Sequence, residues 1–228
     1  MGYYIDGKSI EINPKCMRLI GQGKKGNVYK YDKTTAIKVF KENIDTPIDR
    51  ETADYLSNIS TDRIILPKSL LFYNNVFKGY TYKLVPKIGS GKRIIMLSKT
   101  ELFNDVRILE NDIEKLSQQK VILSGIDRDN IIFNGELYIA DPTGYRIVCD
   151  CDDVEEKEVL ERTNKLKLHL LLIDLITKEL EAGRFSNDVV NCIKTMLNMK
   201  DASIDSSKFL IDMIYEDDSI KEFAKRLQ

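Results

Sequence analysis

The sequence predicts an α+β protein with two lobes, in which a β-rich first lobe precedes a reduced, mainly α-helical second lobe. Residues 1–86 hold short runs of β-branched and aromatic residues separated by polar turns, which is typical of strands. After residue 98, apolar residues recur mostly at helical spacing. A polar, glycine-containing segment at 87–92 (KIGSGK) separates the two patterns. We therefore expect the lobes to span residues 1–86 and 87–228.

The first lobe is expected to consist mostly of strands. Two turn signals, Asp6-Gly7 and Asn74-Asn75, each lie between two apolar runs and predict hairpins. A helix is expected over Pro47–Ser57, because proline is tolerated in a first helical turn and nearby acidic residues favour the helix dipole. The expected strands are Tyr3–Ile5, Ser9–Ile12, Met17–Ile20, Val28–Tyr31, Thr35–Phe40, Ile64–Leu66, Ser69–Tyr73 and Tyr80–Val85.

The second lobe is expected to be helical, with one strand-rich interruption. Ser98–Glu101 has the sequence of a capping box, and apolar residues continue the helical pattern through Leu116. A strand-rich island follows at 120–148, and then an acidic stretch at 150–158 that we interpret as a solvated surface segment. A hydrophobic helix is expected over Val159–Leu180, with Gly183 ending it and two smaller helices after it.

Composition limits the classes of partner. The 35 basic and 36 acidic residues leave a formal charge of −1, so no basic excess indicates nucleic acid. The sequence has no run of about 18 apolar residues that would indicate a membrane span. The first residues lack the charged and apolar regions of a signal peptide, and Asp6 stands where a myristoylation signal needs Ser or Thr. We expect a cytoplasmic protein without nucleic-acid or membrane partners.

The cysteines and the single histidine do not indicate a metal site. Cys149 and Cys151 would share one face of a strand, but a zinc site needs about four ligands. His169 lies within an apolar helical segment, where a packing role is the simpler interpretation. We expect ordinary thiols and a helix-packing histidine.

The most informative segment is a glycine-rich motif in the first lobe. Gly21, Gly23 and Gly26 form G-x-G-x-x-G, a spacing that lets a backbone turn tightly and approach phosphate oxygens. The alternative interpretation is a dinucleotide fingerprint, which requires a helix directly after the glycines. Here the chain continues as Asn27–Tyr31 (NVYKY), which favours a strand. A strand–turn–strand phosphate loop is therefore the favoured interpretation.

The residues after this loop carry a family resemblance. Val28 follows Gly26 by two residues, and Ala36-Ile37-Lys38 begins ten residues beyond Gly26. Together they resemble the glycine-rich loop and phosphate-pairing lysine of the protein kinases. The resemblance implies a two-lobed protein-kinase-like fold, of the small, divergent bacterial kind, that binds ATP and Mg²⁺. The implied ATP-binding residues are Gly21, Gly23, Gly26, Val28, Ala36 and Lys38, with the adenine hinge near Leu84 and Val85.

A second polar constellation lies in the strand-rich island. Asn130 precedes an apolar strand, Ile131–Phe133, and Asp141 follows the next strand, Leu137–Ala140, after a turn at Asn134-Gly135. Two hard oxygen ligands beside one hairpin are what a Mg²⁺–nucleotide site requires, although an ordinary hairpin with polar ends is the alternative. The pair resembles the metal-binding asparagine and aspartate of the kinase catalytic core.

The same resemblance assigns an acidic residue to orient Lys38. Glu51 lies in the predicted helix 47–57 and shares a face with Tyr55 four residues on. By analogy with the kinase regulatory helix, Glu51 would form an ion pair with Lys38, with Asp54 as a rival in the same helix.

One position departs from the family in a way that affects catalysis. The kinase catalytic Asp lies five residues before the metal-binding asparagine, and that position is Gly125 here. Glycine cannot accept a proton, which leaves three accounts. The protein is a pseudokinase, or the loop is rearranged so that Asp127 or Asp129 acts, or an Asp has been replaced at position 125. Asp127 is displaced by two residues, whereas catalysis tolerates misplacement of only about 1 Å.

Two further departures limit the expected activity. Asp141-Pro142-Thr143-Gly144 replaces the family's Asp-Phe-Gly, and Pro142 fixes φ and lacks a backbone donor. The segment between Asp141 and the next helix is short for an activation loop or a peptide-docking platform. The sequence therefore suggests an ATP-dependent phosphotransferase that acts on a Ser/Thr hydroxyl of an unknown protein or on a small-molecule hydroxyl, or an inactive variant of one. The alternative is a pseudokinase that acts as a nucleotide-dependent binding or regulatory module.

Overall fold

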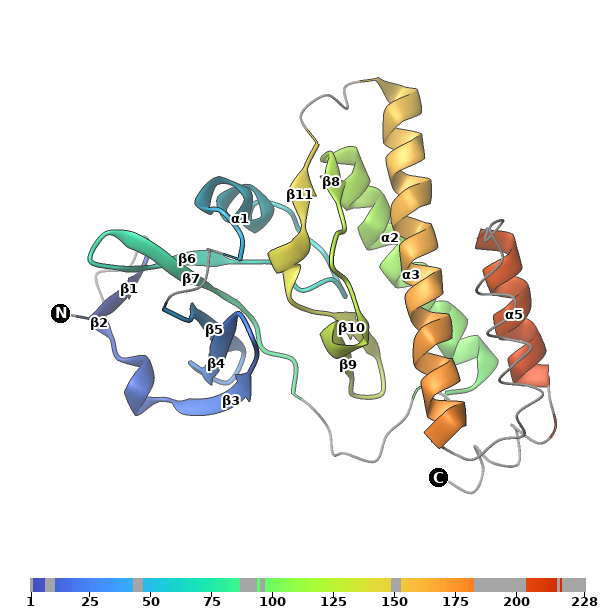
Figure 1. Cartoon of the computed structure of the whole chain (residues 1–228), viewed down its shortest axis with the longest axis horizontal. Helices are drawn as coiled ribbons and strands as arrows, with labels where there is room; N and C mark the ends of the chain where they lie inside the picture. The colour runs from blue at the N-terminus through green and yellow to red at the C-terminus, as the bar shows by residue number, and fades with distance from the viewer. Residues whose placement is uncertain are drawn as a thin grey trace.

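A seven-stranded antiparallel sheet forms the first lobe, and helices dominate the second (Figure 1). The computed structural model describes residues 2–6, 11–42, 47–86, 94, 97–148, 153–182, 204–216 and 218. The predicted α+β class is confirmed, with a β-rich first lobe before a mainly helical second one. The boundary segment expected at 87–92 lies outside the described residues.

The strand order of the sheet is β2-β1-β6-β7-β5-β4-β3. Asn74 and Asn75 both have positive φ in the turn between β6 and β7, as their short polar side chains allow. Most predicted strands are confirmed with shifts of one or two residues, but β7 begins four residues before the predicted Tyr80, and residues 9–10 of the second predicted strand lie outside the described residues. The segment 64–66 forms only an isolated bridge from Ile64 to Ile139. The bounds are β1 Tyr3–Ile5, β2 Glu11–Ile12, β3 Arg18–Gln22, β4 Gly26–Lys30, β5 Thr35–Phe40, β6 Ser69–Tyr73 and β7 Val76–Lys83.

The pairing register gathers the predicted nucleotide residues on one face of the sheet. Val28 on β4 lies opposite Lys38 on β5, and Lys38 lies opposite Tyr80 on β7. Ala36 lies two residues before Lys38, so its side chain points to the same face. Ile37 and Val39 point to the other face, where they pack in a separate cluster with Leu71 and Ile5. Alternation along β5 therefore directs Lys38 toward the second lobe's side of the sheet.

Glycine is required where β7 passes β5. Gly79 has φ +156°, and a Cβ atom added there would lie 1.9 Å from the carbonyl oxygen of Lys38. A glycine inside a strand pattern is a known sign of such close backbone approach. The backbone of β7 is thus packed directly against the backbone that presents Lys38.

The first helix is shorter than the sequence suggested. Helix α1 spans Arg50–Ser57, and the Asp49 carboxylate caps it by accepting a hydrogen bond from the Thr52 amide. The helix therefore begins after Asp49 rather than at Pro47, because an N-cap residue takes an extended conformation. Its buried residues are Thr52, Ala53 and Leu56.

The second lobe is built on two long helices that pack together. Helix α2 spans Lys99–Gln118, and its predicted capping box at Ser98 and Glu101 is confirmed. Helix α3 spans Val154–Ala182, so it begins five residues earlier than expected; Glu155 and Glu156 lie in its first turn, where the helix dipole favours acids. Helix α5 spans Ile204–Glu216, and Gly183 lies outside the described residues. Between α2 and α3 lie β8 Val121–Ile122, β9 Ile131–Phe133, β10 Leu137–Ile139 and β11 Arg146–Ile147.

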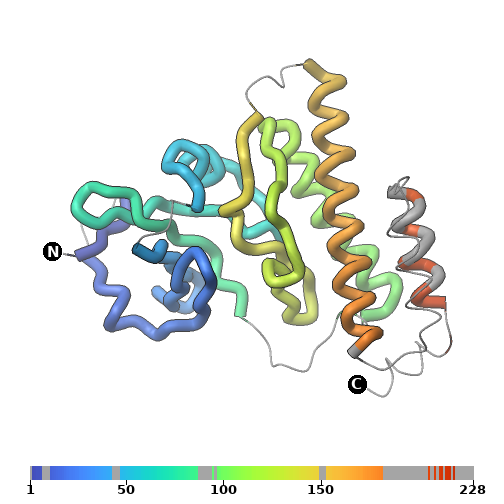
Figure 2. Tube along the Cα trace, in the orientation of Figure 1, coloured from blue at the N-terminus to red at the C-terminus, as the bar shows by residue number. Residues whose placement is uncertain are grey.

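A buried carboxylate joins the two lobes. Asp112 on α2 is fully buried and accepts backbone hydrogen bonds from Asp62, Arg63 and Ile64, at 2.7–3.1 Å. This holds the chain after α1 beside β10, where Ile65 donates to the Ile139 carbonyl oxygen at 2.7 Å. The same segment can be followed in Figure 2, where it runs from α1 to the hairpin of the second lobe.

We expect Asp112→Ala to lower the free energy of unfolding by about 2–4 kcal/mol, because it leaves three backbone donors of the joint without their acceptor. Chemical denaturation monitored by circular dichroism measures this. Glu114→Ala, an exposed acid on the same helix, is the matched control and should change stability by less than about 0.5 kcal/mol. Equal effects of the two variants would contradict the role of Asp112.

Candidate functional site

An ion pair between the lobes lies at the centre of the predicted site. The Lys38 ammonium on β5 is 2.5 Å from Oδ1 of Asp141, which follows β10. Lys38 is 6% exposed, whereas the Asp141 side chain keeps 31% of its surface accessible. Asp141 has φ 60°, a left-handed conformation that aspartate tolerates better than most residues, and its Oδ1 also accepts from the Thr143 amide. Two residues predicted from separate halves of the sequence are therefore in contact.

The pair is ionised in a poorly hydrated environment. Burial raises the pKa of Asp141, but the charge and hydrogen bond of Lys38 outweigh burial and hold it below its usual 3.8. Burial lowers the pKa of Lys38, and Asp141 opposes that change. Burial, followed by the charge of Asp141, raises the pKa of Tyr80, Tyr82 and Tyr145. These phenols are therefore neutral, and the negative charge of Asp141 is balanced by the ammonium of Lys38.

The glycine-rich hairpin lies over this pair. Gly26 is the glycine that the hairpin requires, since a Cβ there would lie 2.7 Å from the Val39 carbonyl oxygen and 3.5 Å from Cε of Lys38. Gly21 and Gly23 have room for a Cβ, at 3.5 and 3.7 Å from the nearest atom. The role of these glycines in approaching phosphate remains a prediction.

Lys25 extends the hairpin to the Asp141 segment. Its ammonium donates to Oγ1 of the buried Thr143 at 3.2 Å. The sequence analysis did not identify this contact, because the lysine lies between the glycines of the motif and has no pattern of its own. Two lysines of the first lobe therefore contact the Asp141–Thr143 turn.

Asn130 and Asp141 lie close together at the ends of their hairpin. The Ala140 amide donates to the Asn130 carbonyl oxygen at 2.8 Å, which ties Asn130 to the residue before Asp141. The Asn130 side-chain oxygen accepts from the Asp127 amide at 2.8 Å, and one lone pair of that oxygen stays available. A carboxylate and an amide oxygen are hard donors of the kind that Mg²⁺ takes, so the residues fit the predicted metal.

The loop before Asn130 has a backbone suited to glycine at position 125. Gly125 has φ +68°, and a Cβ there would lie 3.6 Å from Cα of Gly144. Space is available, but the left-handed φ strains an ordinary side chain. Gly144 packs against the same loop, since its Cβ would lie 1.9 Å from the Ser124 carbonyl oxygen. This backbone accommodates glycine better than it would accommodate the family's aspartate.

Asp127 is exposed, and its carboxylate is held by the loop. It caps the short helix Arg128–Asn130 by accepting from the Asp129 amide at 2.9 Å. The structure thus gives this carboxylate a fixed position two residues beyond Gly125, and its catalytic role remains a prediction.

The predicted ion pair between Glu51 and Lys38 is not the one the structure forms. Glu51 is exposed in the first turn of α1, whose buried residues are Thr52, Ala53 and Leu56. Lys38 pairs with Asp141 instead. The rival Asp54 is also exposed. The buried face of α1 carries Thr52, Ala53 and Leu56, so Glu51 lies on the exposed side, which helical spacing alone did not reveal.

The predicted hinge follows β7 directly. The Leu84 amide donates to the Thr34 carbonyl oxygen at 2.7 Å, and Val85 is buried against Ile65 and Tyr138. Its recognition of adenine stays a prediction, because it would depend on backbone groups.

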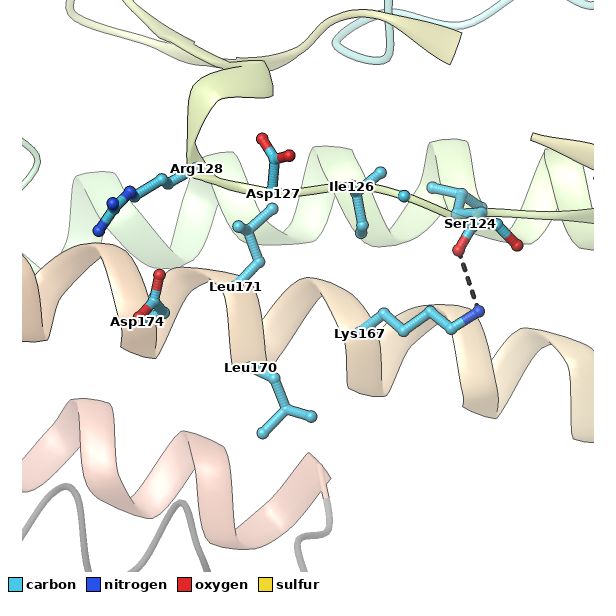
Figure 3. A pocket seen from close by; sticks show the side chains of 10 residues that line it. Ser124, Ile126, Asp127, Arg128, Lys167, Leu170, Leu171 and Asp174 are labelled. Atoms are coloured by element: carbon cyan, nitrogen blue, oxygen red, sulfur yellow. Dashed lines mark hydrogen bonds between the residues drawn. The ribbon is translucent and has the colours of Figure 1, made fainter. Parts of the chain in front are cut away.

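Two residues of α3 that the sequence analysis missed support the loop. Asn164 is fully buried and bonds the Leu123 amide at 3.0 Å and the Val121 carbonyl oxygen at 2.9 Å. Lys167 donates to the Leu123 carbonyl oxygen at 3.0 Å (Figure 3). A polar asparagine in a hydrophobic helix was the available signal, because a buried amide needs partners.

The remaining expectations concern His169 and the cysteines. His169 is fully buried on α3, and its Nε2 lies 2.8 Å from Oε1 of Glu110 on α2, as a helix-packing residue would. Cys16 is a free, exposed thiol, and Cys149, Cys151 and Cys192 lie outside the described residues.

Across the described part of the chain, none of the helices combines the length and apolar character needed to cross a bilayer.

Comparisons with known proteins add little to this geometry. No protein-family model matches the chain, and no curated protein matches it. One matching solved structure is the Legionella pneumophila kinase Lpg2603 bound to IP6, at 14% sequence identity and a TM-score of 0.45. The match covers 68% of this chain and 60% of that chain, so this chain spans less than two thirds of its neighbour. The description of the site therefore rests on this chain's own topology and on the contact between Lys38 and Asp141.

We expect Asp141→Asn to lower the free energy of unfolding by about 1–3 kcal/mol at neutral pH, because it leaves the Lys38 charge buried without its partner. Since folding lowers the pKa of Asp141, its stabilisation is present above about pH 4 and is lost as the pH falls through the folded-state value. The difference between parent and variant should therefore shrink at pH 3. Denaturant titrations at both pH values measure it.

Glu51→Gln is the matched control for that comparison. It also removes one carboxylate, but from an exposed position, so stability should change by less than about 0.5 kcal/mol. A loss in Glu51→Gln equal to that in Asp141→Asn would show that the helix carboxylate is the partner of Lys38.

Proposed function

We propose that this chain binds ATP with Mg²⁺ between its lobes, in the manner of a protein kinase. The observation that supports the proposal most strongly is the 2.5 Å ion pair of Lys38 and Asp141 beside the glycine-rich hairpin. Phosphate oxygens need a cation that is preorganised in a dry site, and Mg²⁺ needs hard oxygen ligands. The contact of Lys38 with Asp141 would bring the cation and one oxygen ligand of the metal together at one place.

Each residue has a defined task in this proposal. Lys38 donates to the α- and β-phosphates, while the backbone of the hairpin at Gly21, Gly23 and Gly26 covers them. Asp141 and Asn130 hold Mg²⁺, which supplies neutralisation of phosphate charge when it is bound. The ion pair places Lys38 next to Asp141, and it would open on binding, so that the Lys38 ammonium donates to phosphate and the Asp141 carboxylate holds Mg²⁺.

Phosphoryl transfer is the second part of the proposal, with a Ser/Thr or small-molecule hydroxyl as acceptor. Asp127 is the exposed carboxylate of the loop and is held in place by its cap on the Asp129 amide, so it would orient the hydroxyl. The competing candidate is a nucleotide-binding pseudokinase. The left-handed backbone at Gly125 favours that candidate, because it indicates a loop adapted to glycine.

We expect Mg-ATP to raise the melting temperature of the parent chain, and the increase to disappear in Lys38→Met and in Asp141→Asn. Differential scanning fluorimetry with and without Mg²⁺ measures it. Glu51→Gln should retain the full increase, since its carboxylate is exposed and does not contact Lys38. An unchanged melting temperature in the parent would rule out the nucleotide site.

If the chain transfers phosphate, Asp127→Asn should lower the rate at least about tenfold, while Asp129→Asn, an exposed acid of the same loop, should not. Transfer of radiolabelled γ-phosphate to the chain itself or to added hydroxyl compounds measures this. A gain of orders of magnitude in Gly125→Asp would instead show that position 125 lost a catalytic aspartate. Absence of transfer in every variant, with the ATP-induced stabilisation intact, would establish the pseudokinase.

A further inference from the structure

Lys25 is a cation of the glycine-rich hairpin whose side chain has no task in the nucleotide binding proposed above. It lies between Gly23 and Gly26 in the turn that joins β3 to β4. Its ammonium reaches the second lobe, where it donates to Oγ1 of Thr143 at 3.2 Å. Thr143 is buried and lies two residues after Asp141. The Lys25 side chain therefore connects the hairpin to the turn that carries the proposed metal ligand.

The backbone of the hairpin fixes Lys25 next to the Lys38 side chain. The Gly23 amide donates to the Gly26 carbonyl oxygen at 2.9 Å, and the Lys41 amide donates to the Lys25 carbonyl oxygen at 3.3 Å. Gly26 lies directly against Lys38, since a Cβ added to Gly26 would lie 3.5 Å from Cε of Lys38. Both ammonium groups therefore approach one turn of the second lobe from neighbouring positions.

The two ammonium groups have unequal partners at this turn. Lys38 pairs with the Asp141 carboxylate at 2.5 Å, whereas among the described residues Lys25 bonds the neutral hydroxyl of Thr143. Burial, and in smaller part the positive charge of Lys25, lowers the pKa of Lys38, while Asp141 opposes that change. The two cations are thus near enough to repel each other, and an anion placed between them would relieve that repulsion.

A phosphate group is a stronger partner for Lys25 than the hydroxyl of Thr143, because it is charged. The proposed nucleotide binding assigns the α- and β-phosphates to Lys38 and the metal to Asp141. Metal ions in such sites bridge oxygens of the β- and γ-phosphates, so the terminal phosphate would lie beside the turn that follows Asp141. The Lys25 ammonium already lies at that turn, through its bond to Thr143.

We propose that the Lys25 side chain binds the terminal phosphate of the nucleotide, so that the site selects a nucleoside triphosphate over the diphosphate and the monophosphate. This inference rests on the proposed nucleotide binding, and it adds a side-chain contact to the backbone contacts of the hairpin. Before nucleotide binds, the hydroxyl of Thr143 keeps the ammonium close to the place where the phosphate arrives. Lys25 then exchanges a neutral acceptor for a charged one.

Titration calorimetry of the full chain with ATP, ADP and AMP, each with Mg²⁺, tests the assignment. The parent should bind ATP more tightly than ADP. Lys25→Met should weaken ATP binding at least about tenfold but change ADP and AMP binding less than about threefold, because only the triphosphate presents the group that Lys25 contacts. Lys25→Arg should keep most of the preference for ATP, since it keeps the positive charge.

Lys24→Met is the matched control, because Lys24 is an exposed lysine of the same turn and the variant removes the same charge one residue away. It should leave the preference for ATP over ADP unchanged. Absence of nucleotide binding by the parent would overturn the proposed function and this inference with it. If the parent binds Mg-ATP, the assignment of Lys25 alone is overturned by any of three results in Lys25→Met. These are unchanged ATP affinity, an equal loss for ATP, ADP and AMP, or a loss for ATP that Lys24→Met reproduces.

Discussion

The ion pair of Lys38 and Asp141 is the contact on which the functional interpretation depends. It joins a strand of the first lobe to the turn after β10 in the second, and it brings together the two residue types that a Mg²⁺–nucleotide site requires. Burial makes each charge costly alone, so each stabilises the other. The surrounding tyrosines are neutral and do not compete as charged partners.

Several backbone contacts fix the position of that pair. Asp112 holds residues 62–64 against α2, and the following residues pair with Ile139, two positions before Asp141. On the other side, Gly79 allows β7 to approach the backbone of Lys38. Both ends of the ion pair are therefore positioned by buried structure rather than by exposed loops.

The sequence predicted most strands and the capped helix α2, because strand and helix periodicity and turn residues are local signals. The same signals placed Lys38 on a strand, and Asn130 and Asp141 at the ends of one hairpin. The sequence did not predict the role of Glu51 correctly. Tertiary packing decides which face of a short helix is buried. In α1 the buried face is that of Thr52, Ala53 and Leu56. Nor did the sequence identify Asp112, because an acidic residue on a helix is ordinarily solvated, and only the position of residues 62–64 makes it an acceptor.

Gly125 bears on the proposed phosphate transfer and not on the proposed nucleotide binding. Its left-handed backbone gives a structural reason for glycine at a position where the kinase resemblance leads one to expect aspartate. Holding a nucleotide is thus better supported than catalysis.

The most direct test of the central claim uses Mn²⁺ in place of Mg²⁺, with ATP, in amide spectra of the folded chain. If Asp141 and Asn130 hold the metal, paramagnetic broadening should appear at the amides of Asn130, Ala140 and Asp141 only when ATP is present, while that of Asp212, on the distant helix α5, stays sharp (Figure 1). Broadening that is centred elsewhere, or that does not depend on ATP, would contradict a Mg²⁺–nucleotide site at this ion pair.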